Sequence, residues 1–357
     1  MGSGGAYYPG VNALRGLAAL LVVVQHAGSF AAQATGTPQA EVLRLDFGML
    51  GVLMFFTISG FVIGLNRHLP TAEFLVRRAL RIYPPFWAAY ALSALIVWSI
   101  GLQTTWSWVA ALLLPSRATP AIYLPLWTLT FEVFFYALAA FVFSLRLSDR
   151  ALTALALCWI IVIANMNPYM TGMLPILPGA LIPFAPYNIF FAVGLICALN
   201  FGFLSRYSLN QFLAVTVAAT VLMTLLPPAP YIATTLVMAV AQASLLMAVT
   251  KVDRWARPAT YLGNASYGLF LLHFSVMAVA GALLKGSGLS VGEMWAVLFV
   301  IGLAVGMPYG LAEFAFHRAA LRKALPLFRR KQVPPQPAEL PAVVAFDDRR
   351  EANRSRT

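Results

Sequence analysis

Residues 47–66 read FGMLGVLMFFTISGFVIGLN, a run of 20 residues without a charged side chain. A helix of about 20 apolar residues is long enough to cross the hydrocarbon core of a bilayer. Comparable runs recur along the chain, so the sequence predicts an all-α membrane protein, a polytopic bundle of about ten transmembrane helices. The predicted spans lie near residues 13–32, 47–66, 83–102, 123–145, 151–167, 186–204, 211–228, 230–250, 261–284 and 292–316.

The composition of the 357-residue chain excludes a soluble protein. Hydrophobic residues make up 61% and charged residues 10%, and the mean hydropathy is +0.79. Soluble domains average about 25% charged residues, and so few charges could not cover a soluble core of this size. The two cysteines, Cys158 and Cys197, lie in apolar stretches and match no metal-ligand spacing, so we expect no metal site.

Lysine and arginine residues gather on one side of the predicted topology. If the N-terminus is inside, the outer loops carry only Arg44, Arg117 and Lys285. Because cytoplasmic loops are enriched in basic residues, we predict that both termini are cytoplasmic. The net charge of +12 then indicates topology and contact with membrane lipid, not nucleic acid.

Some segments depart from the spanning pattern. Residues 105–115 are short and flanked by tryptophan, which indicates an interfacial segment, and residues 168–186 contain five prolines, which predicts a loop or re-entrant element. We divide the chain into a membrane domain over 1–317 and a disordered, basic and Pro-rich cytoplasmic tail over 318–357. The first helix has an alternative as a cleaved signal peptide, because residues 32–34 (AQA) follow its apolar run.

Ionisable side chains inside predicted spans are rare here. Because burying such a group in a membrane costs free energy, each one indicates a candidate functional residue. Arg15 and His26 are 11 residues apart on the first helix, which puts them within about 20° of one face and about 16 Å apart along the axis. That arrangement suits an extended ligand with an anionic head and a reactive far end, the shape of a coenzyme A ester. The alternative is an arginine that reaches lipid headgroups and a histidine bonded to a neighbouring helix.

Two further groups are predicted to lie at the depth of His26. Counted along their helices, Glu132 and His273 reach a similar level, so three ionisable side chains would meet there. A carboxylate beside an imidazole would raise its basicity and fix its tautomer. The alternatives are a structural ion pair for Glu132 and, for His273, a packed histidine bonded to a backbone carbonyl.

Arginines also cluster at the predicted inner edge of the third span. Arg77 and Arg81 share a helix face and, with Arg78, could bind phosphate through their guanidinium forks, although a topology signal alone also explains them. Ser59 precedes Gly60 in an aromatic run, where small residues favour close helix packing over a nucleophilic role.

In their order, these motifs resemble the acyltransferase-3 family of integral membrane acyltransferases over residues 10–318. Arg15 and His26 reproduce its R-x10-H signature, and Glu313 falls where the family has an acidic residue closing the last helix. Asn12 departs from the family, which often has an acidic residue just before the first arginine. Four further stretches carry the resemblance: 51–61 (GVLMFFTISGF), 77–87 (RRALRIYPPFW), 126–136 (LWTLTFEVFFY) and 262–273 (LGNASYGLFLLH).

The resemblance implies O-acylation in a bacterial inner membrane. An acyl group, typically acetyl, would pass from cytoplasmic acyl-CoA to a hydroxyl of a surface or secreted glycan or its lipid-linked precursor, without a permanently bound cofactor. His26 would be the general base, and Glu132 would orient it or contact the acceptor. Glu313 would pair with an inner arginine. The donor phosphates would be held by Arg15, Arg77, Arg78 and Arg81. Residues that would line the site are Ser59, Ser266, Tyr267 and His273.

Two other classes of function remain open on the sequence. A secondary transporter could use Arg15, His26 and Glu132 as a proton relay. A non-catalytic assembly subunit would need these residues only for complex formation.

Overall fold

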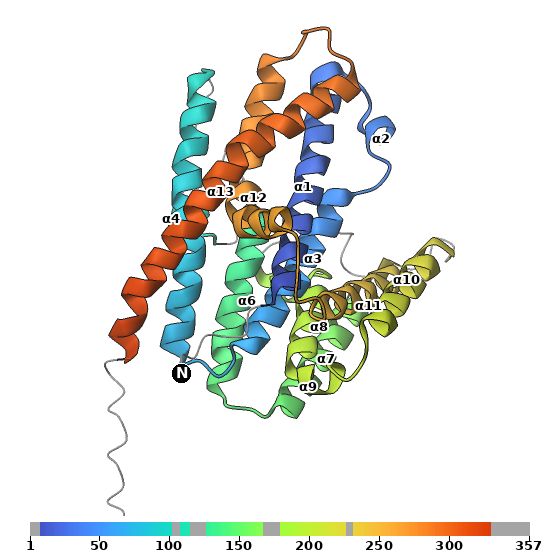
Figure 1. Cartoon of the computed structure of the whole chain (residues 1–357), viewed down its shortest axis with the longest axis vertical. Helices are drawn as coiled ribbons and strands as arrows, with labels where there is room; N and C mark the ends of the chain where they lie inside the picture. Colours follow the sequence, from blue (N-terminus) through green and yellow to red (C-terminus); the bar gives the residue numbers. More distant parts are fainter. Residues whose placement is uncertain (1–7, 102–107, 115–125, 167–178, 226–230, 330–357) are drawn as a thin grey trace, which may run out of the picture.

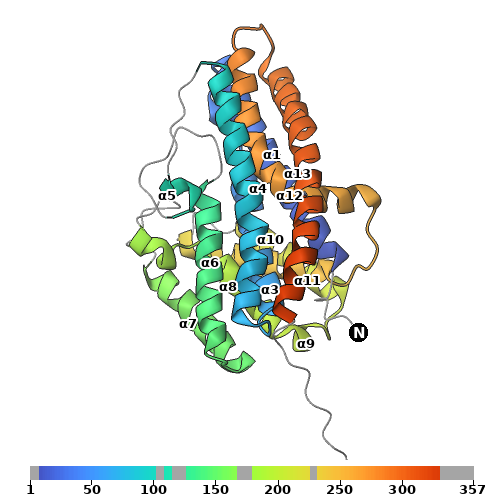
Figure 2. The same ribbon diagram turned by 90° about the vertical axis from the view of Figure 1, so that its left-hand side faces the viewer.

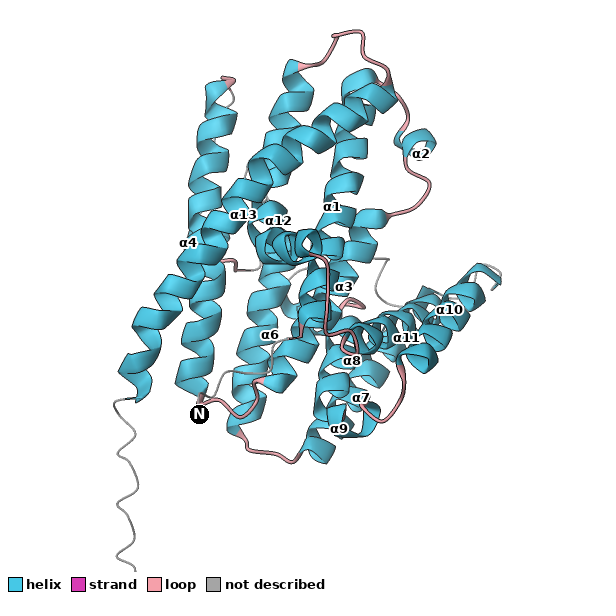
Figure 3. Cartoon of the chain, viewed as in Figure 1, coloured by secondary structure: helices cyan, strands magenta, loops and turns pink. Residues whose placement is uncertain are grey.

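A computed structural model of the chain describes residues 8–101, 108–114, 126–166, 179–225 and 231–329 (Figure 1). These residues form helices and no strand (Figure 3), so the predicted all-α class is confirmed. Eight of the helices are long and apolar enough to cross a membrane. They are α1 (Pro9–Thr35), α3 (Phe47–Leu65), α4 (Thr71–Ser99), α6 (Leu126–Ser144), α7 (Asp149–Met166), α11 (Tyr231–Val249), α12 (Arg257–Leu283) and α13 (Val291–Arg329).

Two predicted spans correspond to shorter apolar helices, α8 (Asn188–Leu199) and α10 (Leu209–Leu225). The 12 residues of α8 rise only about 18 Å, too little for the hydrocarbon core. The chain interrupts this predicted span at Asn200, whose side-chain amide bonds back to the carbonyl of Ile196. The remaining elements are α2 (Gln39–Val42), α5 (Trp108–Ala111), the 3-10 helix η2 (Gly179–Phe184) and α9 (Phe201–Leu204).

Two helices extend well beyond their predicted bounds. α4 begins at Thr71, directly after Pro70, so the arginine cluster lies on the helix itself. α13 continues to Arg329, so residues 318–329 prolong the last helix and are not part of a tail. Residues 330–357 lie outside the described residues, as do parts of the segments predicted to be interfacial (105–115) and re-entrant (168–186).

The first helix lies at the centre of the bundle. α1 packs against α3, α12 and α13, and α12 also packs against α4 (Figure 2). α1 contributes buried side chains to all three apolar clusters of the core, for example Val22, Leu14 and Ala27. This central place favours an integral helix over a removable signal peptide.

The two ends of the bundle differ in charge. Figure 1 shows the α3–α4 turn, the α6–α7 turn and the last turns of α13 at one end, with the α12–α13 turn at the other. The first end, which we call the basic end, carries Arg67, Arg146, Arg150 and Arg318. Arg67 there forms an ion pair with Asp149, which ties the α3–α4 turn to α7.

Two glycines let α3 and α8 touch backbone to backbone. A Cβ atom at Gly60 would collide with the carbonyl oxygen of Phe191, and one at Gly194 with the carbonyl oxygen of Thr57. The packing role predicted for the Ser59–Gly60 pair therefore belongs to Gly60. Ser59 lines a cavity instead.

We expect Gly60→Ala to lower the stability of the protein by about 1–3 kcal/mol, because the new methyl group must push two helices apart. A fall in the thermal unfolding temperature of the detergent-solubilised protein would measure this. Gly202→Ala is the matched control, since its Cβ would meet no atom within 4 Å. Equal unfolding temperatures for both variants would contradict the prediction.

Candidate functional site

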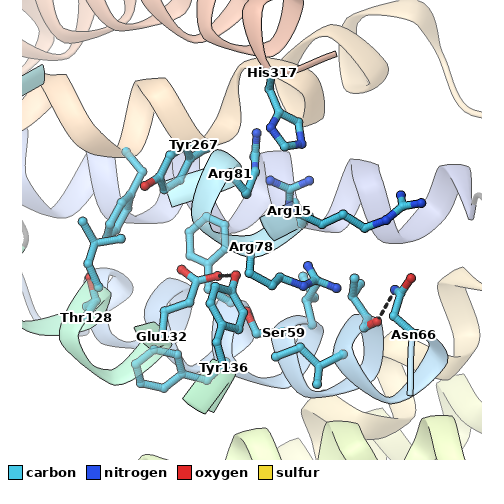
Figure 4. Close-up of a pocket in the computed structure, with 18 of the residues that line it drawn as sticks. Arg15, Ser59, Asn66, Arg78, Arg81, Thr128, Glu132, Tyr136, Tyr267 and His317 are labelled. Carbon is cyan, nitrogen blue, oxygen red and sulfur yellow. Dashed lines mark hydrogen bonds between the residues drawn. The ribbon is translucent and has the colours of Figure 1, made fainter. Parts of the chain in front are cut away.

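A cavity of about 360 Å³ enters the bundle near the basic end and is lined by residues of six helices, α1, α3, α4, α6, α12 and α13 (Figure 4). Its volume is in the range of small-molecule sites. We call it the arginine cavity. Its charged lining residues are Arg15, Arg77, Arg78, Arg81 and Glu132.

Two of the four arginines are neutralised by carboxylates. Arg81 binds Glu313 at 2.6 Å, which confirms the predicted pairing of Glu313 with an inner arginine, and the Glu313 side chain is only 1% exposed. The guanidinium of Arg81 also lies over the Tyr267 ring, 4.7 Å from its centroid. Arg77 pairs with Glu73 one turn earlier on α4.

The other two arginines have no acidic partner within the described part of the chain. Arg78 packs against the rings of Phe74 and Tyr136, and its buried Nε has no hydrogen-bond acceptor among the described residues. Arg15 makes no hydrogen bond or ion pair with any residue that the structure describes, and it borders the same space (Figure 4). Two guanidinium groups inside a membrane protein, each without a carboxylate at ion-pair distance among the described residues, favour an anionic ligand.

Glu132 lies in the arginine cavity, where it accepts a hydrogen bond of 2.5 Å from the Tyr136 hydroxyl. The prediction that it meets His26 is therefore wrong. The depth count assumed that its helix starts at the membrane surface. Figures 1 and 2 show that α6 begins alongside the middle of α4, which moves Glu132 toward the basic end.

His26 lines a second cavity, of about 350 Å³, formed by the last turns of α1, the segment that follows, α2 and α12. We call it the histidine cavity. Among the described residues, none that lines it is charged, and its polar groups besides His26 come from Ser29, Gln33, Thr37 and Gln39. The arginine and histidine predicted to serve one extended ligand thus border different cavities.

The predicted meeting of His26 and His273 is confirmed. His26 Nδ1 lies 2.8 Å from His273 Nε2, and the two rings stack with centroids 5.1 Å apart. His273 is fully buried, and its Nδ1 lies 2.8 Å from the Leu269 carbonyl oxygen.

A thin aromatic layer separates the two cavities. Phe55 and Phe270 line the arginine cavity and pack edge to face, 5.5 Å between centroids. Phe270 in turn lies 6.2 Å from the His273 ring, which contacts His26. These contacts connect the lining of the arginine cavity to His26 in the histidine cavity.

The remaining residues predicted to line the site do not lie together. Tyr267 borders the arginine cavity and donates its hydroxyl proton to the Ile82 carbonyl. Ser266 borders neither cavity. It is fully buried and bonds to the Gly263 carbonyl of its own helix. Asn12 lies on the neighbouring face of α1, where its amide donates to Asn264.

Some polar lining residues of the arginine cavity were not selected from the sequence: Asn66, Thr128, Tyr136 and His317. Two of them had a usable signal. Tyr136 and His317 follow Glu132 and Glu313 by four residues, the spacing that puts side chains on one helix face.

We expect Glu313→Leu to destabilise the protein by about 3–5 kcal/mol, because it leaves the Arg81 guanidinium without its carboxylate. The double variant Arg81→Met/Glu313→Leu should recover most of that loss, since neither charge of this pair then remains without its partner. Thermal unfolding measures both. A double variant no more stable than the single one would contradict this reading of the pair.

A family model described as an acyltransferase domain matches residues 8–313 of the chain. No curated protein and no solved structure matches the chain.

Proposed function

Since the chain belongs to the acyltransferase-3 family and is thus a membrane acyltransferase, we propose that it moves an acyl group, most simply acetyl, from acyl-CoA to a hydroxyl of a glycan. The glycan would be a surface or secreted polysaccharide or its lipid-linked precursor. The two-cavity arrangement carries this proposal: a cationic cavity at one end, an uncharged one toward the other, and a histidine at their junction.

The arginine cavity would hold the donor. Coenzyme A esters carry phosphates at one end, and Arg15 and Arg78 offer guanidinium groups that form no ion pair with a described residue. Arginine binds phosphate oxygens through two parallel hydrogen bonds, which suits both charge and shape. Arg77 and Arg81 would add to the positive electrostatic potential at the rim. The carboxylate of Glu132, which also orients Tyr136, would limit that potential.

The acyl end of the donor would extend past Phe55 and Phe270 to the histidine pair. There His26 would act as general base on an acceptor hydroxyl in the histidine cavity. As the acceptor oxygen bonds to the acyl carbon, the C–S bond breaks. The proton taken by His26 then passes to the departing thiol.

The basic end would face the cytoplasm, with both ends of the chain there and the protein in a bacterial inner membrane. The distribution of basic residues supports this orientation. Donor and acceptor would then reach the enzyme from opposite sides of the membrane.

Sealed membrane vesicles of both orientations test the donor side. Vesicles that expose the cytoplasmic face should release thiol from added acetyl-CoA and acetylate the glycan fraction, and right-side-out vesicles should not, because the donor cannot cross the bilayer. Proton NMR of polysaccharide from a deletion strain, with and without the restored gene, reports the acceptor. Thiol release without loss of glycan acetyl groups on deletion would remove the glycan but keep the enzyme; no protein-dependent thiol release would overturn the proposal.

A further inference from the structure

Three groups in a row define the environment of His26. The Leu269 carbonyl oxygen lies 2.8 Å from His273 Nδ1, and His273 Nε2 lies 2.8 Å from His26 Nδ1. The Leu269 carbonyl oxygen can take only one part in these hydrogen bonds, because a carbonyl oxygen accepts a hydrogen bond and never donates one.

That constraint fixes the direction of both hydrogen bonds if His273 is neutral. Its Nδ1 must carry the proton given to Leu269, which leaves Nε2 as an acceptor. His26 must then donate from Nδ1. If the His26 ring is neutral as well, its other nitrogen, Nε2, carries no proton.

A neutral His273 is what its surroundings favour. The side chain is fully buried. Among the residues that the structure describes, no carboxylate pairs with either histidine. Apart from His26, the ring neighbours of His273 among the described residues are Phe270 and Phe274, and a charged imidazolium here would be both desolvated and uncompensated.

We propose that His273 is a positioning residue that holds His26 in the Nδ1–H tautomer, so that Nε2 is the basic atom offered to the histidine cavity. This rests on the proposed function for its use in catalysis, but the tautomer itself is a property of the resting protein. A backbone carbonyl here takes the orienting role that a carboxylate has in many catalytic histidines.

Nitrogen NMR on the full-length protein in lipid, labelled with 15N in histidine, tests the tautomer without any substrate. The His68→Gln and His317→Gln substitutions remove the other two signals. We expect both remaining rings to be neutral with Nδ1 protonated and Nε2 free at neutral pH. A proton on Nε2 of His26, or a doubly protonated ring, would overturn the proposal even if the enzyme is an acyltransferase.

Steady-state kinetics test whether this tautomer of His26 is used in catalysis. His273→Leu removes the acceptor and should lower kcat at least tenfold, with the KM for the acyl donor nearly unchanged, because the donor phosphates bind elsewhere. His273→Gln places a side-chain oxygen that can accept from His26, and it should recover a large part of kcat. Ser266→Ala on the same helix is the matched control for a buried hydrogen bond with no contact to either cavity. Unchanged kcat in His273→Leu would refute the role, whereas an intact tautomer in a protein with no transferase activity would refute only the function.

Discussion

The His26→Ala variant is expected to lose about 10²–10⁴-fold in kcat for acyl transfer. General base catalysis by one side chain contributes that much, and no other imidazole borders the histidine cavity within the described residues. Thiol release from acetyl-CoA by membranes with equal amounts of each variant measures the loss. With acetyl-CoA that carries a label in its acetyl group, the same membranes also allow the transfer of label to the acceptor fraction to be measured.

His68→Ala is the matched control for this variant. His68 is exposed on the turn after α3 and has no contact with either cavity, so its removal should leave kcat unchanged. Thermal unfolding shows whether the unpaired His273 ring has disturbed the bundle in His26→Ala. A stable His26→Ala protein with wild-type turnover would rule out the general base.

The Arg15→Gln variant is expected to lower kcat/KM for acetyl-CoA by about 10- to 150-fold, the factor that corresponds to the roughly 1.5–3 kcal/mol of a charge-assisted hydrogen bond. The loss should depend on the phosphates of the donor. An acetyl thioester of pantetheine, which has the same reactive end without phosphates, should therefore be a poor substrate for both proteins and should show nearly equal kcat/KM.

Arg206→Gln supplies the control for net charge, because Arg206 is exposed and lies outside the arginine cavity. Its kcat/KM with acetyl-CoA should match the wild type. If Arg15→Gln instead lowers the rate with the pantetheine thioester as much as with acetyl-CoA, Arg15 acts on the bundle or on the reacting end, not on phosphate.

Local pattern was enough to predict some of this architecture. Uncharged runs located the apolar helices. Arg15 and His26 lie on one helix as predicted, but they border two cavities and not the single extended site that their 11-residue interval suggested. Depth on a second helix could not be obtained in the same way. It depends on where that helix starts relative to its neighbours, which is why His273 was placed correctly beside His26 and Glu132 was not.

Charge compensation could be predicted only in part, because Glu313 was expected to pair with an inner arginine but not with a particular one. The sequence alone does not distinguish the four arginines from one another. Only the packing of α4 against α13 assigns Glu313 to Arg81. That Arg15 and Arg78 have no acidic partner in the described part of the chain, the observation on which the donor site depends, follows from the packing of six helices together.

The aromatic layer between the cavities has an electrical consequence. If the two cavities open to opposite faces of the membrane, as we propose, and fill with water, the insulating path is short, and much of the transmembrane voltage would fall across Phe55, Phe270 and the histidine pair. A full elementary charge that crosses 100 mV changes in energy by about 2.3 kcal/mol. In the proposed mechanism, a neutral acyl group would cross this region without electrical work, whereas a proton shared by the histidines would not, so the membrane potential would act on the protonation of His26.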